Sequence, residues 1–162
     1  MSQTAQKPKI LLARSVFPDL LAELEKVAIV QSNQNDHLWN AVDLKAALAD
    51  KDAAIITGSE RIDADMLKAS PQLKIVSNIA VGYNNLDMPA FKAANVMATN
   101  TPDVLTDTTA DFGFTLMMAT ARRVTESEHW LRVGHWGKFS ICDAPLSMDI
   151  HHSTLGIMGM GR

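Results

Sequence analysis

The chain has 162 residues, enough for one sizeable domain or for a small domain with part of a second. Hydrophobic residues make up 47% and charged residues 20%, which excludes a disordered protein, and the net charge of -3 without a basic run gives no sign of a nucleic-acid or anionic-membrane partner. No apolar run approaches the about 20 residues of a membrane span, and the first ten residues do not resemble a signal peptide. With a single cysteine, Cys142, no internal disulfide can form, so we expect a cytoplasmic protein.

Short apolar runs rich in valine and isoleucine recur along the first hundred residues. Such runs are typical of strands that are buried on both faces of a parallel sheet. We therefore predict strands at residues 9–13, 27–30, 53–57, 73–78 and 96–99.

Amphipathic stretches lie between these runs and predict helices at residues 18–27, 41–50, 63–70 and 86–95. Pro18 suits the first turn of the first helix, Asp63 can cap the third, and Asn95 is suited to end the fourth. The alternation of strand and helix predicts an α/β fold, a parallel sheet with helices on both faces.

The pattern changes after Asn100, where the turn-rich sequence NTPD is followed by a helical stretch over residues 106–133. As one helix it would be roughly 40 Å long, and Thr106 can cap it. Its middle, residues 112–121, is apolar nearly all round, which fits either a core helix of a single domain or a helix buried between domains or subunits. The length of the stretch favours the second interpretation.

Residues 134–152 form an irregular segment with tryptophan, proline and glycine but no period, which we interpret as a functional loop or an interaction arm. The segment LGIM at residues 155–158 then predicts a buried strand. It leads into Gly159 and Gly161, the first two glycines of the G-x-G-x-x-G turn that binds the pyrophosphate of a dinucleotide. A plain turn remains the alternative, because a lone G-x-G is weak evidence.

Three stretches together resemble the D-isomer-specific 2-hydroxyacid dehydrogenases, and within them the glyoxylate/hydroxypyruvate reductase (2-ketogluconate reductase) branch. They are NIAVGYNNLDMPAFKAANV, NTPDVLTDTTADFGFTLMMATARRV and HHSTLGIMGMGR. The resemblance covers the chain from Lys9 onward and implies a subunit of about twice this length, of which this chain is the N-terminal part. Residues 1–100 would form a flavodoxin-like substrate domain, and residues 101–162 the linking helix, the arm and the first strand of a Rossmann domain.

The resemblance also implies a function. The parent would be a homodimer, formed through the long helix and the arm, and would transfer hydride between NAD or NADP and a small 2-keto acid. Backbone N–H groups at Val81 and Gly82 would hold the substrate carboxylate, although VGYNN by itself is more readily interpreted as an ordinary βα turn. Thr109 would lie near the nicotinamide, or serve only as a capping hydroxyl. Gly159, Gly161 and Arg162 would lie on the pyrophosphate turn.

The catalytic Arg, Glu and His of the family have no counterpart in this chain. The five histidines do not replace them, and none has metal-ligand spacing to cysteine or carboxylate partners. We therefore expect no catalytic and no metal-binding residue here. The alternatives to a reductase are an inactive binding or dimerisation module and a cofactor-sensing regulator on the same fold. The residues that decide between NAD and NADP are not in the sequence, and the sequence does not identify the keto acid.

Overall fold

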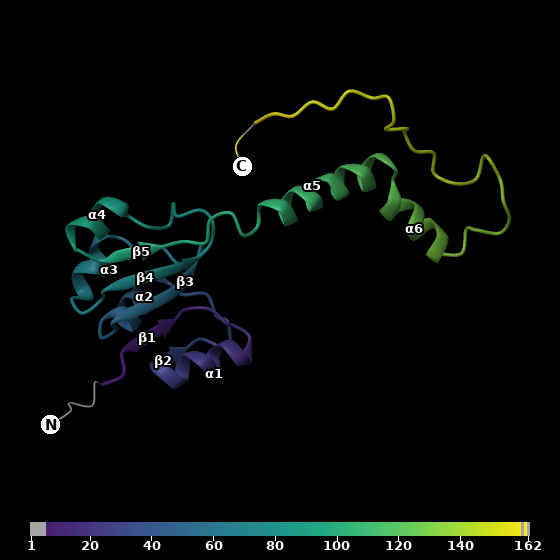
Figure 1. The fold of residues 1–162 in the computed structure, drawn as a ribbon. Coiled ribbons are helices and arrows are strands. Elements are labelled where there is room, and N and C mark those ends of the chain that lie inside the picture. Colours follow the sequence, from purple (N-terminus) through teal and green to yellow (C-terminus); the bar gives the residue numbers. More distant parts are fainter. Residues whose placement is uncertain (1–5, 160, 162) are drawn as a thin grey trace. The chain divides into compact units, whose positions relative to one another are not determined.

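The computed structural model describes residues 6–159 and residue 161 (Figure 1). It divides into two compact units, residues 1–104 and residues 105–162. The first unit holds all the strands and a hydrophobic core, and the second holds two helices followed by an irregular segment. No helix in the described ranges is both long enough and apolar enough to cross a membrane.

Five parallel strands form the sheet of the first unit, in the order β2-β1-β3-β4-β5. This is the flavodoxin-like, doubly wound order, and the predicted α/β class is confirmed. The strands are β1 (Lys9–Leu12), β2 (Ile29–Ser32), β3 (Ala53–Thr57), β4 (Ile75–Ile79) and β5 (Met97–Thr99).

Four helices connect these strands: α1 (Pro18–Val27), α2 (Ala41–Leu48), α3 (Ala64–Ala69) and α4 (Met88–Ala93). Pro18 opens α1 as predicted, and the Asp63 carboxylate caps α3 by accepting from the N–H of Met66 at 3.0 Å. Asn95 lies just past the end of α4 with a φ of 54°, the left-handed conformation that ends a helix.

The sheet is not buried equally on its two faces. Ala54, Ile56 and Val76 belong to the core together with residues of α2, α3 and α4. Their neighbours along β3 and β4 are only partly buried, and β2 at the edge is largely exposed. The prediction of strands buried on both faces is therefore wrong. Right-handed crossovers place α2, α3 and α4 on one face and leave only α1 to cover the other.

The second unit begins with two helices, α5 (Thr106–Ala121) and α6 (Val124–Arg132), instead of the single helix predicted over residues 106–133. The break lies at Arg123, whose φ of 51° is left-handed and cannot continue a helix. The Arg123 guanidinium donates to Glu126 Oε2 at 2.6 Å and to the carbonyl of Leu146 at 2.8 Å, and these bonds offset part of the strain.

Two further predictions for this unit, the Thr106 cap and the LGIM strand, are wrong, and one of the two alternatives for the long helix is excluded. The N-cap residue of α5 is Leu105, without a side-chain hydrogen bond, so Thr106 does not cap the helix. No residue of α5 is buried, which excludes a core helix, and Phe112 and Phe114 are more than half exposed. The LGIM segment forms no strand, because no other described segment of the unit pairs with it.

Candidate functional site

Polar side chains gather where the parallel strands end. Arg14 follows β1, Glu60 follows β3, Asn78 is the penultimate residue of β4, and Asn100 follows β5. The chain reverses its direction of travel across the sheet between β1 and β3, and ligands of doubly wound sheets bind outside the carboxyl ends of the strands near such a point. This edge is therefore the candidate site of the first unit.

In the loop after β4, residues 80–83, each of the first three carbonyl groups accepts a hydrogen bond from the protein. Ala80 O accepts from the Thr101 N–H at 3.0 Å, Val81 O from Asn100 Nδ2 at 2.8 Å, and Gly82 O from Asn78 Nδ2 at 3.0 Å. Within the described part of the chain, the N–H groups of Val81, Gly82 and Tyr83 have no acceptor. Successive free N–H groups of this kind are suited to bind an anion.

Gly82 is not required by the fold. Its φ lies outside the left-handed region, and a Cβ placed on it would meet no atom within 4 Å. A turn that needs glycine for its backbone conformation would show a positive φ. The open space over Gly82 therefore gives a ligand access to the backbone of the loop.

The loop after β3 is organised by Glu60, whose side chain is buried. Glu60 Oε2 accepts from the N–H of Thr57 at 2.8 Å and from its hydroxyl at 3.0 Å. Glu60 Oε1 lies 4.0 Å from Arg14 Nη1, and Arg14 Nη2 donates to Asp36 Oδ2 at 2.9 Å. The backbone N–H of Ser15, with Arg14 beside it, holds the pKa of Asp36 below its ordinary value. These contacts link the ends of β1, β2 and β3.

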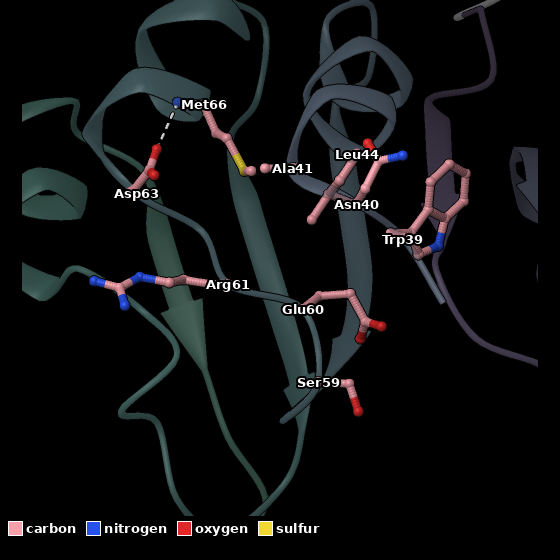
Figure 2. A pocket seen from close by; sticks show the side chains of 9 residues that line it. All are labelled: Trp39, Asn40, Ala41, Leu44, Ser59, Glu60, Arg61, Asp63 and Met66. Atoms are coloured by element: carbon pink, nitrogen blue, oxygen red, sulfur yellow. Dashed lines mark hydrogen bonds between the residues drawn. The ribbon is translucent and has the colours of Figure 1, made fainter. Parts of the chain in front are cut away.

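Two pockets open at this edge. The one in Figure 2 has a volume of about 150 Å³, and the Glu60 carboxylate turns toward the side where Trp39 and Asn40 lie, whereas Arg61 extends the opposite way. The other, of about 340 Å³, adjoins the 80–83 loop through Tyr83 and Asn100. The second falls within the size range of small-molecule sites, and of the 80–83 loop only Tyr83 lines it.

The predicted site residues divide between the two units. Val81 and Gly82 lie together in the 80–83 loop. Thr109 is in the first turn of α5, where its N–H donates to Leu105 O at 2.9 Å. Gly159, with a φ of 99°, and Gly161 lie in the irregular segment of the second unit, and Arg162 lies outside the described residues.

Sequence reasoning did not find Asn78, Asn85, Asn100 or the Glu60–Arg14 contact. The only signal for Asn78 is a polar residue at the end of an apolar run, which the sequence shows at several strand ends. Of the histidines, His37 belongs to the first unit, and His151 in the second unit lies 3.6 Å from an Asp149 oxygen. The described residues contain no group of three or more side chains suited to hold a metal ion.

Known proteins resemble this chain over nearly its whole length. A family model for the catalytic domain of D-isomer specific 2-hydroxyacid dehydrogenases matches residues 10–144. A glyoxylate reductase of Thermococcus onnurineus is 40% identical over 159 residues, which are 96% of this chain and 48% of that protein. Glyoxylate/hydroxypyruvate reductase B of Yersinia pestis is 40% identical over 156 residues, covering 96% of this chain and 47% of that protein.

A solved structure is also similar to this chain. The NADPH-dependent glyoxylate/hydroxypyruvate reductase of Sinorhizobium meliloti, in complex with NADP and malonate, superposes with a TM-score of 0.67 and 30% identity, over 88% of this chain and 44% of that one. The chain spans about half the length of the curated relatives it matches.

Proposed function

The chain belongs to the D-isomer specific 2-hydroxyacid dehydrogenase family, and from this premise we propose that it is the N-terminal part of an NAD(P)-dependent reductase of small 2-keto acids. The family that the three sequence stretches indicated is thereby confirmed. Glyoxylate and hydroxypyruvate are the proposed substrates, because relatives at 40% identity are named for reducing them.

The arrangement of the 80–83 loop carries the proposal. A 2-keto acid has a carboxylate next to its reacting carbonyl, and Val81 and Gly82 would bind that carboxylate through their free N–H groups. The absence of a Cβ at Gly82 leaves room for the anion. The relative from Sinorhizobium was solved with malonate, itself a carboxylate, in addition to NADP.

The second unit contains the residues that would hold the dinucleotide. Gly159 has a positive φ, and a Cβ added to it would meet no atom within 4 Å, so a pyrophosphate can approach its backbone closely. Gly161 and Arg162 would continue this turn, and Thr109 would lie near the nicotinamide. When bound, the cofactor supplies the hydride. The choice between NAD and NADP is left open, and residues 101–162 are proposed to begin the Rossmann domain that follows a substrate domain of residues 1–100.

No residue of this chain is proposed to donate the proton to the keto oxygen. General acid catalysis contributes about 10²–10⁴-fold to rates, so the 162-residue chain should not reduce a keto acid measurably. The full-length protein should consume NADH or NADPH when glyoxylate or hydroxypyruvate is added, followed by the loss of cofactor absorbance. A full-length protein that oxidises neither cofactor with either acid would refute the proposed reaction. Turnover by the 162-residue chain would refute the proposal that the catalytic groups lie outside this chain.

We further propose that the parent is a homodimer formed through α5 and the arm of residues 134–152. Every residue of α5 is at least partly exposed, and large apolar side chains stand out along both segments, including Phe112, Phe114, Phe139 and Ile141. Apolar patches of this kind mark interaction surfaces. Analytical ultracentrifugation of the full-length protein tests this proposal, and a monomer at micromolar concentration would contradict it.

A further inference from the structure

We propose that Asn100 and Asn78 are positioning residues that turn the amide groups of the 80–83 loop outward, and that the N–H of Tyr83 is a third donor to the bound carboxylate. The inference rests on the proposed function, because it takes the carboxylate of a keto acid as the ligand. It adds two side chains that touch no substrate and one donor beyond Val81 and Gly82.

The argument starts from the geometry of the peptide group. A trans peptide is planar, so its C=O and the N–H of the next residue point in opposite directions. A side chain that holds the carbonyl of one residue therefore fixes the direction of the following N–H. In the 80–83 loop, holding three successive carbonyls against the protein turns the N–H groups of Val81, Gly82 and Tyr83 the other way.

Asn100 acts on the second of these peptides. Its Nδ2 donates to Val81 O at 2.8 Å, and the same peptide carries the N–H of Gly82. The preceding peptide is fixed by the backbone, because the Thr101 N–H donates to Ala80 O at 3.0 Å. Asn100 and Thr101 follow β5, next to β4 in the sheet, so the end of one strand orients the loop of its neighbour.

Asn78 acts on the third peptide. Its buried side chain donates to Gly82 O at 3.0 Å, and that peptide carries the N–H of Tyr83. Asn78 is itself held by Asn85, whose Oδ1 lies 3.3 Å from Asn78 Nδ2. Asn85 Nδ2 in turn donates to the carbonyls of Thr57 at 3.1 Å and Glu60 at 2.8 Å. The loop after β4 is thereby attached to the loop after β3.

Each of these positions uses a side-chain hydrogen-bond donor. Asn78 and Asn85 each use the amide nitrogen as donor and the amide oxygen as acceptor, and Asn100 uses its nitrogen to donate to a carbonyl. An aspartate has nearly the same shape but only acceptors when ionised. At position 100 it would repel Val81 O and release the peptide that carries the Gly82 N–H.

If Asn100 and Asn78 had only a structural role, replacing them would lower stability and leave carboxylate binding unchanged. Asn33 provides the matched control for such a role. Asn33 is, like Asn78, a buried asparagine near the end of a strand, and its Nδ2 donates to the loop carbonyls of Ala13 at 2.9 Å and His37 at 2.8 Å. It forms no hydrogen bond with the 80–83 loop. Asn33→Ala should lower the melting temperature and leave carboxylate binding unchanged.

The first measurement uses the ¹⁵N-labelled 162-residue chain and oxamate, an unreactive carboxylate analogue of a keto acid. The amide resonances of Val81, Gly82 and Tyr83 should shift together on titration. In Asn100→Ala and Asn100→Asp the Gly82 response should weaken, and its order parameter should fall from about 0.85 toward 0.6 or below. Absence of a Tyr83 or Gly82 response in the unsubstituted chain, or a response in Asn100→Ala equal to it, would overturn the inference.

The second measurement uses the full-length protein with glyoxylate. The carboxylate is bound alike in the ground and transition states, so Asn100→Ala should raise KM about tenfold and change kcat little. An unchanged KM, or an equal rise in Asn33→Ala, would overturn the inference. If the oxamate responses are as expected and the full-length protein reduces no keto acid, the proposed reaction fails and the anion site with its positioning residues stands.

Discussion

Adding a methyl group at Gly82 separates the requirements of binding from those of folding. The Cβ of Gly82→Ala would enter open space, with no atom within 4 Å, on a backbone whose φ suits any residue. The substitution should therefore change the free energy of unfolding by less than about 1 kcal/mol. Alanine lowers the conformational entropy of the unfolded chain, which favours a small gain in stability.

The effect on binding should be much larger. A methyl carbon keeps an oxygen about 3.5 Å away, whereas an N–H···O⁻ bond needs about 2.8 Å between its heavy atoms. The anion must withdraw from at least one N–H, and a hydrogen bond to a charged group is worth about 1.5–3 kcal/mol. KM for glyoxylate should then rise roughly 10- to 100-fold, and Gly82→Val should raise it further.

The assay is steady-state reduction of glyoxylate by the full-length variants, with thermal melts of the same preparations. Gly58→Ala is the matched control, because its Cβ would make an ordinary 3.9 Å contact with Ala80 and lies in the other loop of this edge. An unchanged KM for Gly82→Ala with an unchanged melting temperature would refute the binding of the carboxylate at this loop. A lowered melting temperature would refute the conclusion that the fold does not need this glycine.

Local signals in the sequence predicted the first unit well. Pro18 and Asp63 act at helix starts through their own backbone geometry or side chain, and neither role depends on distant residues. The run at residues 53–57 coincides with β3, the central strand. The unequal burial of the two faces was missed because it depends on the side of the sheet over which each crossover passes, and hydrophobic periodicity does not contain that information.

The errors in the second unit have a different origin. The break at Arg123 has neither glycine nor proline to announce it, and left-handed backbone costs a residue such as arginine about 1–2 kcal/mol. Contacts with Glu126 and Leu146 help to offset this cost, and Leu146 lies 23 residues further along the chain. The LGIM segment at residues 155–158 has the composition of a buried strand, but a strand forms only with a hydrogen-bonding partner.

The candidate site was predictable only as far as its motif. Val81 and Gly82 came from the resemblance of AVGYN to a known family, and the structure adds the reason why their N–H groups are free. That reason is the set of bonds from Thr101, Asn100 and Asn78 to the loop carbonyls. Two of these donors lie 19 or more residues from their acceptors in the sequence, so no local pattern reveals them.

Three further results are expected. Hydrogen bonds from Lys51 and Lys9 lower the pKa of Asp50 to about 2, and the Lys9 N–H and Lys74 lower that of Asp52. Because the pKa of each carboxyl is lower in the folded chain than in the unfolded chain, its ionised form stabilises the fold, and this contribution should be full above about pH 5. It should fall toward pH 2, less steeply in Asp50→Asn, as urea titrations at each pH would show. Gly113 lies in the middle of α5 with open space for a Cβ, so Gly113→Ala should stabilise that helix by up to about 1 kcal/mol. Circular dichroism should show a higher melting temperature. A lower melting temperature would contradict the exposed position of Gly113. The 162-residue chain should also self-associate. Its α5 helix has no buried residue, Phe112 and Phe114 are 61% and 58% exposed, and Phe139 and Ile141 in the arm are about 80% exposed. Contiguous exposed apolar surface beyond a few hundred Å² is rare on monomers, and its removal from water favours association. Light scattering should show species larger than a monomer at tens of micromolar, and Phe112→Ser with Phe114→Ser should reduce them. A compact monomer of the unsubstituted chain would mean that α5 covers its apolar side chains within one molecule.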